Sequence, residues 1–200
     1  MKELDIGIVK AKLKEATIGI AGLGGLGSNV AIALARAGIG RLVIVDFDSV
    51  EKSNLSRQAY TVDQVGMRKT EALMQNISKA NPAVDVTAMH LKLEPGAMDA
   101  PFVSVDIIIE ALDNAETKAM FIEEISDKLP NKPIIVASGV AGIRGTERIQ
   151  MRRSGNLYLV QDEKAPSCYD AAVLAPKVGI FAYWQASLAL EILLEGADVD

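Results

Sequence analysis

A glycine-rich run between a predicted strand and a predicted helix is the feature that most constrains the fold. The run is Gly22-Leu23-Gly24-Gly25-Leu26-Gly27. It follows a short buried strand, Thr17–Ala21, and precedes an Ala- and Leu-rich helix at residues 28–37 that ends before Gly38. Glycines here let the backbone turn tightly, and free N–H groups at the helix N-terminus can receive phosphate oxygens. The run therefore predicts a Rossmann-like nucleotide site that uses Gly22, Gly24, Gly25 and Gly27.

Strands and helices alternate along most of the remaining chain. Further strands are predicted at residues 42–45, 84–89, 105–112 and 134–137, and further helices at 2–15, 67–80 and 114–129. This alternation indicates an α/β fold with a mostly parallel sheet and helices on both faces. After Gly145 the pattern changes to two shorter strands, 146–151 and 157–160, which we expect to form a short antiparallel extension near the C-terminus before a closing helix.

Length and the N-terminal residues bear on organisation and location. Two hundred residues, half of them apolar, can bury one sizeable core but are too few for a nucleotide domain plus an ordinary substrate domain. We therefore expect residues 1–200 to form a single domain. The polar start Met1-Lys2-Glu3-Leu4-Asp5 does not resemble a secretion signal, so we expect a cytoplasmic protein.

Composition argues against several classes of function. The net charge of −5 argues against general nucleic-acid binding, which needs a basic face. The most apolar stretch, residues 178–194, contains Gln185, Ser187 and Glu191 and falls short of the roughly 18 to 20 apolar residues of a membrane span. It is typical of a buried helix. One cysteine, Cys168, and one histidine, His90, cannot complete a zinc site, which needs about four such ligands.

A carboxylate follows the second predicted strand. Asp46 comes directly after residues 42–45 and about 20 residues beyond the glycine run, where an acidic side chain can take both ribose hydroxyls of a nucleotide. NAD and ATP sites share these elements, so an NAD-dependent oxidoreductase stays open as an alternative.

Three further features favour ATP over NAD. Arg57 lies in a long polar loop, and Lys69 lies in the first turn of the next helix, where a cation opposes the helix dipole and suggests a bound anion. Asp113 follows strand 105–112 at the expected ligand edge of the sheet, where it can hold Mg²⁺ against phosphates. No Tyr-x-x-x-Lys pair of the hydride-transfer kind follows any of the four tyrosines. The residues therefore predict ATP with Mg²⁺.

Taken together, the motifs form a recognisable series. It runs from the glycine run through Asp46-Phe47-Asp48 and Ser53-Asn54-Leu55-Ser56-Arg57-Gln58 to Lys69, and continues with Leu112-Asp113-Asn114, Ala137-Ser138-Gly139 and Ala175-Pro176-Lys177-Val178-Gly179. The series resembles the ThiF/MoeB branch of the ubiquitin-activating-enzyme superfamily over nearly the whole chain. The short length and residues 110–119 look most like the compact second family of ThiF proteins, which is associated with thiamine biosynthesis.

The resemblance implies an activity and assigns residues to it. Members of the family adenylate the terminal Gly-Gly carboxylate of a ubiquitin-like sulfur carrier protein, release pyrophosphate and generally work as homodimers. By resemblance, Asp113 binds Mg²⁺, Asp48 lies beside the nucleotide, and the ATP contacts come from Gly24, Asp46, Asn54, Arg57, Gln58 and Lys69. A carboxylate is ionised at neutral pH, so its attack on the α-phosphorus needs no general base, and Arg57, Lys69 and Asp113 are the catalytic candidates.

The chain departs from the family pattern in two places. The paired Cys-x-x-Cys motifs are missing, so the structural zinc of larger members is not expected. Members also commonly carry an N-terminal arginine that reaches the partner subunit's active site, whereas the first arginine here is Arg36. Lys10 or Lys12 is a candidate replacement without the forked guanidinium. The missing arginine leaves a non-catalytic nucleotide-binding partner as a second alternative, and the acceptor stays open between a thiamine-type carrier, another sulfur carrier and a tRNA base.

Two features of the C-terminal third carry hypotheses. Cys168 stands eight residues before Pro176, the register of the family's sulfur-transfer cysteine. It is either a thiol that attacks the acyl-adenylate or a small apolar residue that packs. The four arginines 144, 148, 152 and 153 either line a groove for an acidic carrier or solvate an edge strand, and the edge-strand explanation is favoured.

Overall fold

The predicted unit of strand, glycine loop and helix is present in the computed structural model, which describes residues 5–194. Strand β1 (Thr17–Ala21) leads through the glycine run into helix α2 (Gly25–Ala37). The helix begins at Gly25 instead of Ser28, because the last glycines of the run form its first turn. It ends, as predicted, at Gly38 in the left-handed conformation.

The strands of the described residues form one sheet. Its seven strands lie in the order β3-β2-β1-β4-β5-β7-β6. The other strands are β2 (Arg41–Asp46), β3 (Asp85–His90), β4 (Ile107–Glu110), β5 (Ile134–Ser138), β6 (Gln150–Ser154) and β7 (Leu157–Gln161). Neighbours pair in parallel except β6 and β7, which pair antiparallel at one edge. The predicted fold class, with its short antiparallel extension, is confirmed.

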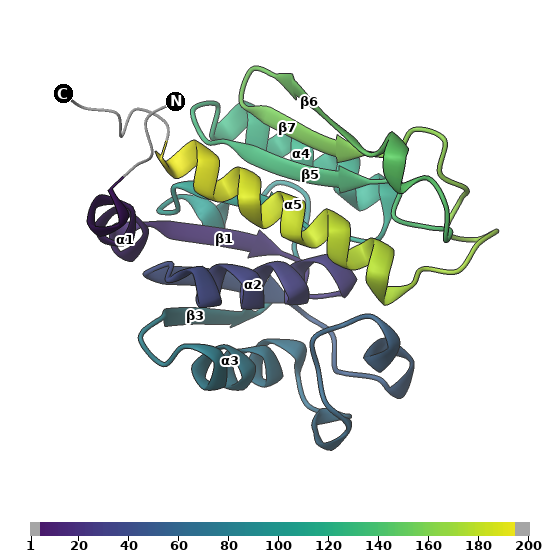
Figure 1. Ribbon diagram of the computed structural model, residues 1–200, viewed down its shortest axis with the longest axis horizontal. Coiled ribbons are helices and arrows are strands. Elements are labelled where there is room, and N and C mark those ends of the chain that lie inside the picture. Colours follow the sequence, from purple (N-terminus) through teal and green to yellow (C-terminus); the bar gives the residue numbers. More distant parts are fainter. Residues whose placement is uncertain (1–4, 195–200) are drawn as a thin grey trace.

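Helices cover both faces of the sheet unequally (Figure 1). Helices α1 (Ile6–Glu15), α2, α3 (Lys69–Ala80) and α5 (Ala175–Leu194) lie on one face, and α4 (Ala115–Lys128) lies on the other. On the first face, the larger core cluster packs buried side chains of the helices, such as Leu34 of α2 and Phe181 of α5, against the strands. On the second face Phe121 of α4 meets Phe102 of the turn η3 (Ala100–Phe102) edge to face, with ring centroids 5.6 Å apart.

Helix α5 is a core helix. Among the described helices it is long and apolar enough, by length and composition alone, to cross a membrane. However, it packs along α2 and over β5, and it buries Lys177 and Gln185 together with its apolar residues. The side-chain amide of Gln185 donates to the carbonyl oxygens of Glu110 and Ile135, both at 3.1 Å. The sequence-based interpretation of this stretch as a buried helix agrees with this packing.

Two predicted strands have different bounds in the structure. The strand expected at 146–151 is wrong in its first half, because Thr146–Arg148 forms the 3₁₀ turn η4 after Gly145, which has a φ of 93°. Only from Gln150 does the chain run along β7. The strand expected at 105–112 is shorter at both ends, because β4 spans only Ile107–Glu110. Just beyond it, the N–H of Leu112 donates at 2.7 Å to the carboxylate of Glu110 instead of to a neighbouring strand.

Candidate functional site

The predicted site residues gather at the carboxyl edge of the parallel strands. The glycine loop follows β1, Asp46 ends β2 and Asp113 follows β4, and these three strands are neighbours in the sheet. In parallel α/β sheets this edge is where ligands bind. The structure therefore brings together side chains that lie more than sixty residues apart in the sequence.

Backbone geometry explains two of the four glycines in the loop. Gly22 has a φ of 89°, and a Cβ there would lie 2.7 Å from the carbonyl oxygen of Ala111. A Cβ on Gly27 would overlap the carbonyl oxygen of Gly22. Both positions therefore need glycine for folding. Around Gly24 and Gly25 the nearest atoms belong to side chains, so these two glycines form the accessible part of the loop.

The N-terminus of α2 has no side-chain cap. Gly24 is the N-cap residue and has no side chain to accept a hydrogen bond from the first turn. The first N–H groups of a helix lack partners within the helix, and they carry the positive end of its dipole. This end of α2 is therefore suited to an anion such as a phosphate.

Asp46 braces the glycine loop from the neighbouring strand. Its Oδ2 accepts from the backbone N–H of Leu23 at 2.6 Å, and its Oδ1 accepts from the N–H of Asp48 at 2.7 Å. Burial raises the pKa of Asp46, while the nearby ammonium of Lys69 and the two N–H groups oppose that rise. Each carboxylate oxygen keeps acceptor capacity beyond these bonds, so Asp46 can hold the loop and also accept from a ligand hydroxyl.

Lys69 is held by carboxylates rather than standing free. It is the first residue of α3 and only 6% exposed, with its Nζ 2.6 Å from Asp48 Oδ2 and 3.9 Å from Asp46 Oδ2. The sequence suggested a bound anion to offset this cation at a helix N-terminus. In the structure the offset comes from Asp48 and Asp46.

The polar loop 46–64 is ordered by two 3₁₀ turns, η1 (Lys52–Ser56) and η2 (Val62–Gln64). Asn54 is buried and forms a reciprocal capping box with Glu51, so its side chain serves the loop itself. Arg57 ends η1, half buried, with its Nη1 donating to the carbonyl oxygen of Ser53 at 3.3 Å. The aliphatic part of Arg57 lies 3.7 Å from where a Cβ on Gly25 would be.

Gln58 lies beside the glycine loop and carries one unsatisfied polar atom. Its Nε2 lies 3.8 Å from where a Cβ on Gly24 would be, and its Oε1 is buried without a hydrogen-bond partner. A buried acceptor without a donor is unfavourable and uncommon in folded proteins. A polar ligand at the loop can supply that donor.

Three residues outside the predicted site connect the polar loop 46–64 to the glycine run by hydrogen bonds. Ser28 donates to the carbonyl oxygen of Gly24 at 2.6 Å and accepts from the N–H of Ala59 at 3.0 Å. Asn29 donates to the carbonyl oxygens of Gly25 and Arg57, and the hydroxyl of Tyr60 donates to that of Leu23 at 2.8 Å. Polar residues in the first turn of an otherwise apolar helix were the available signal for Ser28 and Asn29. Nothing in the local sequence pointed to Tyr60.

Asp113 lies on a turn that is fixed from both sides. Its own side chain is exposed, two residues beyond the contact between Ala111 and Gly22. The turn is held by Glu110, whose buried carboxylate pairs with Lys118 of α4. Burial raises the pKa of Glu110, and Lys118 opposes this rise. Within residues 5–194 no three His, Cys, Asp or Glu side chains gather as a metal site. The role of Asp113 as a Mg²⁺ ligand stays a prediction.

Lys10 and Lys12, the candidate replacements for the missing arginine, lie on α1. That helix precedes β1 and packs near the amino ends of the strands, at the opposite edge of the sheet from the glycine loop (Figure 1). Neither lysine therefore reaches the glycine loop of its own chain.

A second polar cluster lies where β7 ends. Asp162 accepts from Arg148 through both carboxylate oxygens and from the buried ammonium of Lys177 at 3.1 Å. These hydrogen bonds, that from Arg148 first, lower the pKa of Asp162 in spite of its burial. Cys168 is exposed on the loop that connects Asp162 to α5.

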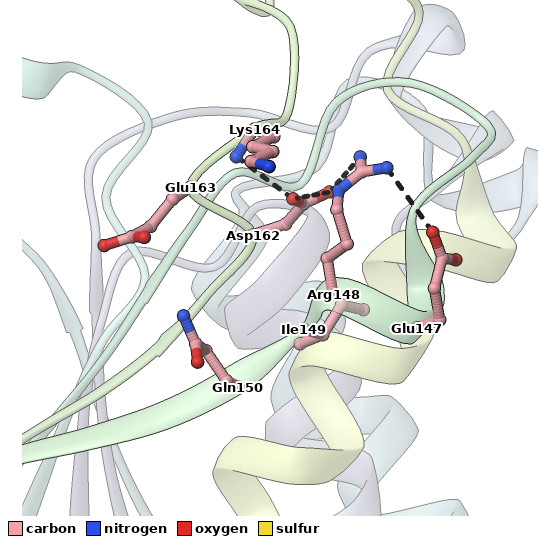
Figure 2. Close-up of a pocket in the computed structure, with 7 residues that line it drawn as sticks. All are labelled: Glu147, Arg148, Ile149, Gln150, Asp162, Glu163 and Lys164. Atoms are coloured by element: carbon pink, nitrogen blue, oxygen red, sulfur yellow. Dashed lines mark hydrogen bonds and ion pairs between the residues drawn. The ribbon is translucent and has the colours of Figure 1, made fainter.

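An open groove of about 290 Å³ lies over this cluster, beside the start of β6, and the glycine run is not among its lining residues (Figure 2). Its lining residues are Glu147, Arg148, Ile149, Gln150, Asp162, Glu163 and Lys164. Carboxylates and cations are mixed along it, so the groove has no uniform charge. Arg152 and Arg153 lie on β6, the edge strand, as the favoured explanation of the arginines requires, whereas Arg148 turns inward to Asp162.

The parallel sheet, the glycine loop at its carboxyl edge and the helix that follows define a Rossmann-like α/β protein. The chain belongs to the ThiF family, whose sequence profile matches residues 7–199. It is 32% identical over 190 residues to the sulfur carrier protein ThiS adenylyltransferase of Escherichia coli, covering 91% of this chain and 74% of that protein. It is 29% identical to the molybdopterin-synthase adenylyltransferase of Salmonella typhimurium, covering 90% and 74%.

Among solved structures, the chain is similar to the Escherichia coli tRNA N6-threonylcarbamoyladenosine dehydratase TcdA in complex with ATP. The TM-score is 0.85 at 24% identity, over 94% of this chain and 90% of that one. This likeness establishes the shared fold. The family resemblance seen in the sequence is thereby confirmed, as is the expected enzyme class, since the related proteins are adenylyltransferases.

Proposed function

We propose that this enzyme uses ATP to adenylate the C-terminal glycine carboxylate of a ubiquitin-like sulfur carrier protein and releases pyrophosphate. The observation that carries the proposal is the uncapped N-terminus of α2, with Gln58 next to Gly24 through its Nε2 and carrying an Oε1 that has no hydrogen-bond partner. Both features call for a ligand with negative oxygens and polar hydrogens. ATP has both, and the relatives of this chain include a sulfur carrier protein ThiS adenylyltransferase and a molybdopterin-synthase adenylyltransferase.

The residues divide the nucleotide between them. Phosphate oxygens would meet the free N–H groups around Gly24 and Gly25, with Arg57 closing the loop from the side. Ribose hydroxyls would donate to the remaining acceptor capacity of Asp46. Lys69, whose Nζ lies 2.6 Å from Asp48 Oδ2, would exchange part of this contact for a phosphate oxygen.

Asp113 is the residue proposed to hold Mg²⁺. Its exposed carboxylate lies at the carboxyl end of the central strand β4, and the other ligands would come from phosphate oxygens and water. When bound, the ion would neutralise charge that develops on the leaving pyrophosphate. Glu110, paired with Lys118, accepts from the N–H of Leu112 directly before Asp113 and so supports this turn.

The chemistry needs positioning more than proton transfer. The carrier carboxylate is already ionised, so one of its oxygens forms a bond to the α-phosphorus while the bond to the pyrophosphate oxygen breaks. The products are a carrier acyl-adenylate and pyrophosphate. Arg57 and Lys69 stabilise the charge that moves toward the leaving group.

A thiamine-type carrier is the proposed partner. The support is the identity to the ThiS adenylyltransferase, which by its name acts on ThiS, together with the run at residues 110–119. The proposal includes a cytoplasmic homodimer, because family members of this kind generally work as homodimers. The mass of the purified protein in solution, measured by light scattering, tests the dimer.

The deciding experiment is pyrophosphate–ATP exchange with Mg²⁺ and a ThiS-type carrier ending in Gly-Gly. Exchange should require the last glycine, so a carrier lacking it is the matched control. A MoaD-type carrier, assayed in parallel, separates the thiamine proposal from a molybdopterin role. Thermal stabilisation by NADH but not by Mg-ATP would instead favour the oxidoreductase alternative, and Mg-ATP binding without exchange on any carrier would favour a non-catalytic partner.

A further inference from the structure

A buried ion pair closes the base of the loop that carries Cys168. Asp162 stands at the end of β7 and Lys177 in the first turn of α5, with Lys177 Nζ 3.1 Å from Asp162 Oδ2. The two side chains are 0% and 4% exposed, respectively. The intervening residues 163–174 form an exposed loop that includes Cys168 and the fully solvent-facing Tyr169.

Lys177 ties this base to a second loop. Its ammonium also donates to the carbonyl oxygens of Ala141 at 2.8 Å and Arg144 at 3.2 Å, both in the segment after β5. The three hydrogens of the ammonium thus meet three acceptors. A lysine in the first turn of a helix opposes the helix dipole, so α5 alone does not favour this residue, and Asp162 with the two carbonyls compensates.

Asp162 has a second cationic partner on its outer side. Arg148 meets it with two hydrogen bonds, Nε to Oδ1 and Nη2 to Oδ2, both at 3.0 Å (Figure 2). The backbone N–H of Lys164 donates to Oδ1 at 3.2 Å. Asp162 therefore keeps one cationic partner when either Lys177 or Arg148 is replaced.

The residue next to Lys177 touches the proposed nucleotide site. A Cβ on Gly25 would lie 3.2 Å from Val178 Cγ1, and 3.7 Å from Arg57 Cγ on its other side. The first turn of α5 is thus one wall of the glycine loop. Lys177 anchors this turn through its side chain, whereas Arg148 reaches Asp162 from η4 and has no such connection to α5.

We propose that Lys177 is a positioning residue that holds the first turn of α5 against the glycine loop and at the same time fixes the base of the Cys168 loop. This inference rests on the proposed ATP site. It predicts that loss of the ammonium disturbs both sides together: the loop opens more often and the glycine loop binds Mg-ATP less tightly.

The test compares Lys177→Met with the matched control Arg148→Met, since each replaces one cation on Asp162 with a neutral chain of similar length. The first measurement is the rate of chymotryptic cleavage after Tyr169, well below the melting temperature of each variant, which reports local opening of the loop without ATP or carrier. The second is the dissociation constant for Mg-ATP, measured by calorimetry.

In Lys177→Met we expect cleavage about tenfold faster and Mg-ATP binding about tenfold weaker, with both values within threefold of wild type in Arg148→Met. Unchanged cleavage in Lys177→Met would overturn the claim that Lys177 fixes the base of the Cys168 loop. Faster cleavage with unchanged affinity, or equal loss of affinity in both variants, would overturn the positioning role. If the wild type fails to bind Mg-ATP, the proposed function fails, and the positioning role fails with it. The cleavage rates still decide whether Lys177 fixes the base of the Cys168 loop.

Discussion

Replacing Gln58 with methionine should leave the nucleotide-free protein as stable as before, or more stable, while it weakens Mg-ATP binding. The reason is the buried Oε1 of Gln58, which has no hydrogen-bond partner in the described residues. Methionine has a similar length and no polar oxygen, so the substitution removes a desolvated acceptor rather than a made hydrogen bond.

The magnitudes follow from that one atom. An unsatisfied buried acceptor costs about 1–3 kcal/mol of stability. Because methionine packs differently from glutamine, part of this gain is lost, and we expect the free energy of unfolding to rise by about 0–1 kcal/mol. That corresponds to a melting temperature about 0–4 °C higher for a chain of this length. If ATP supplies the missing donor, its affinity should fall by about 5- to 150-fold, the equivalent of 1–3 kcal/mol.

Gln64 provides a matched control from the same loop. It is 1% exposed and fully paired: its Nε2 donates to Ala72 O and Asn76 Oδ1, and its Oε1 accepts from Thr61 and Asn76. The same substitution there leaves several groups unpaired and should cost about 3 kcal/mol, or a melting temperature about 6–12 °C lower.

Differential scanning calorimetry without nucleotide and isothermal titration with Mg-ATP measure the two effects. For Gln58→Met we expect an unchanged or higher melting temperature together with weaker Mg-ATP binding. For Gln64→Met we expect a lower melting temperature. If Gln58→Met lowers the melting temperature as far as Gln64→Met does, or leaves the ATP affinity unchanged, the assignment of Gln58 to the nucleotide site is refuted.

Three further predictions follow from the site and its surroundings. Arg57→Ala should lower turnover by roughly 10³-fold, the scale of an arginine finger, and exchange within threefold of wild type would contradict a role at the phosphates. The hypothesis that Cys168 is a sulfur-transfer thiol predicts that Cys168→Ala leaves exchange intact but abolishes thiol-dependent sulfur loading of the carrier, and unchanged loading would refute that hypothesis. Glu124 has a pKa lowered to about 2, chiefly by Lys128 and also by the N–H groups of Gly96 and Met98. Because its folded pKa lies below the ordinary value of 4.5, its stabilisation is present above pH 4.5 and is lost as the pH falls toward 2. The melting temperature of Glu124→Gln should therefore fall less between pH 5 and pH 3 than that of the wild type, and parallel curves would refute this.

The elements of the fold were largely predictable because their signals are local. The strand before Gly22, the helix after it and the end of that helix at Gly38 depend on apolar periodicity and on glycine geometry within a few residues. The strand predicted at residues 146–151 was wrong in its first half for a non-local reason. A turn there lets Arg148 reach Asp162, and the partner of Arg148 lies fourteen residues away in the sequence.

The residue types of the candidate site were also predictable, but their present partners were not. Lys69 suggested an anion at a helix N-terminus, and the structure supplies Asp48. The nucleotide contact of Asn54 stays a prediction, and the partner that the structure adds is the backbone N–H of Glu51, which donates to its side chain. Both partners depend on how a loop folds back on itself, which residue identity alone does not specify.

By itself, the sequence determined the α/β class, the glycine loop at the carboxyl edge and the family, because each depends on residue types in a fixed linear order. Only the tertiary structure decided which polar atoms are paired. It placed Asp46 against Leu23, left the oxygen of Gln58 without a donor and buried Lys177 between Asp162 and two carbonyl groups. The physical reason is that pairing and burial depend on distances between segments far apart in the chain, and those distances exist only once the sheet has assembled.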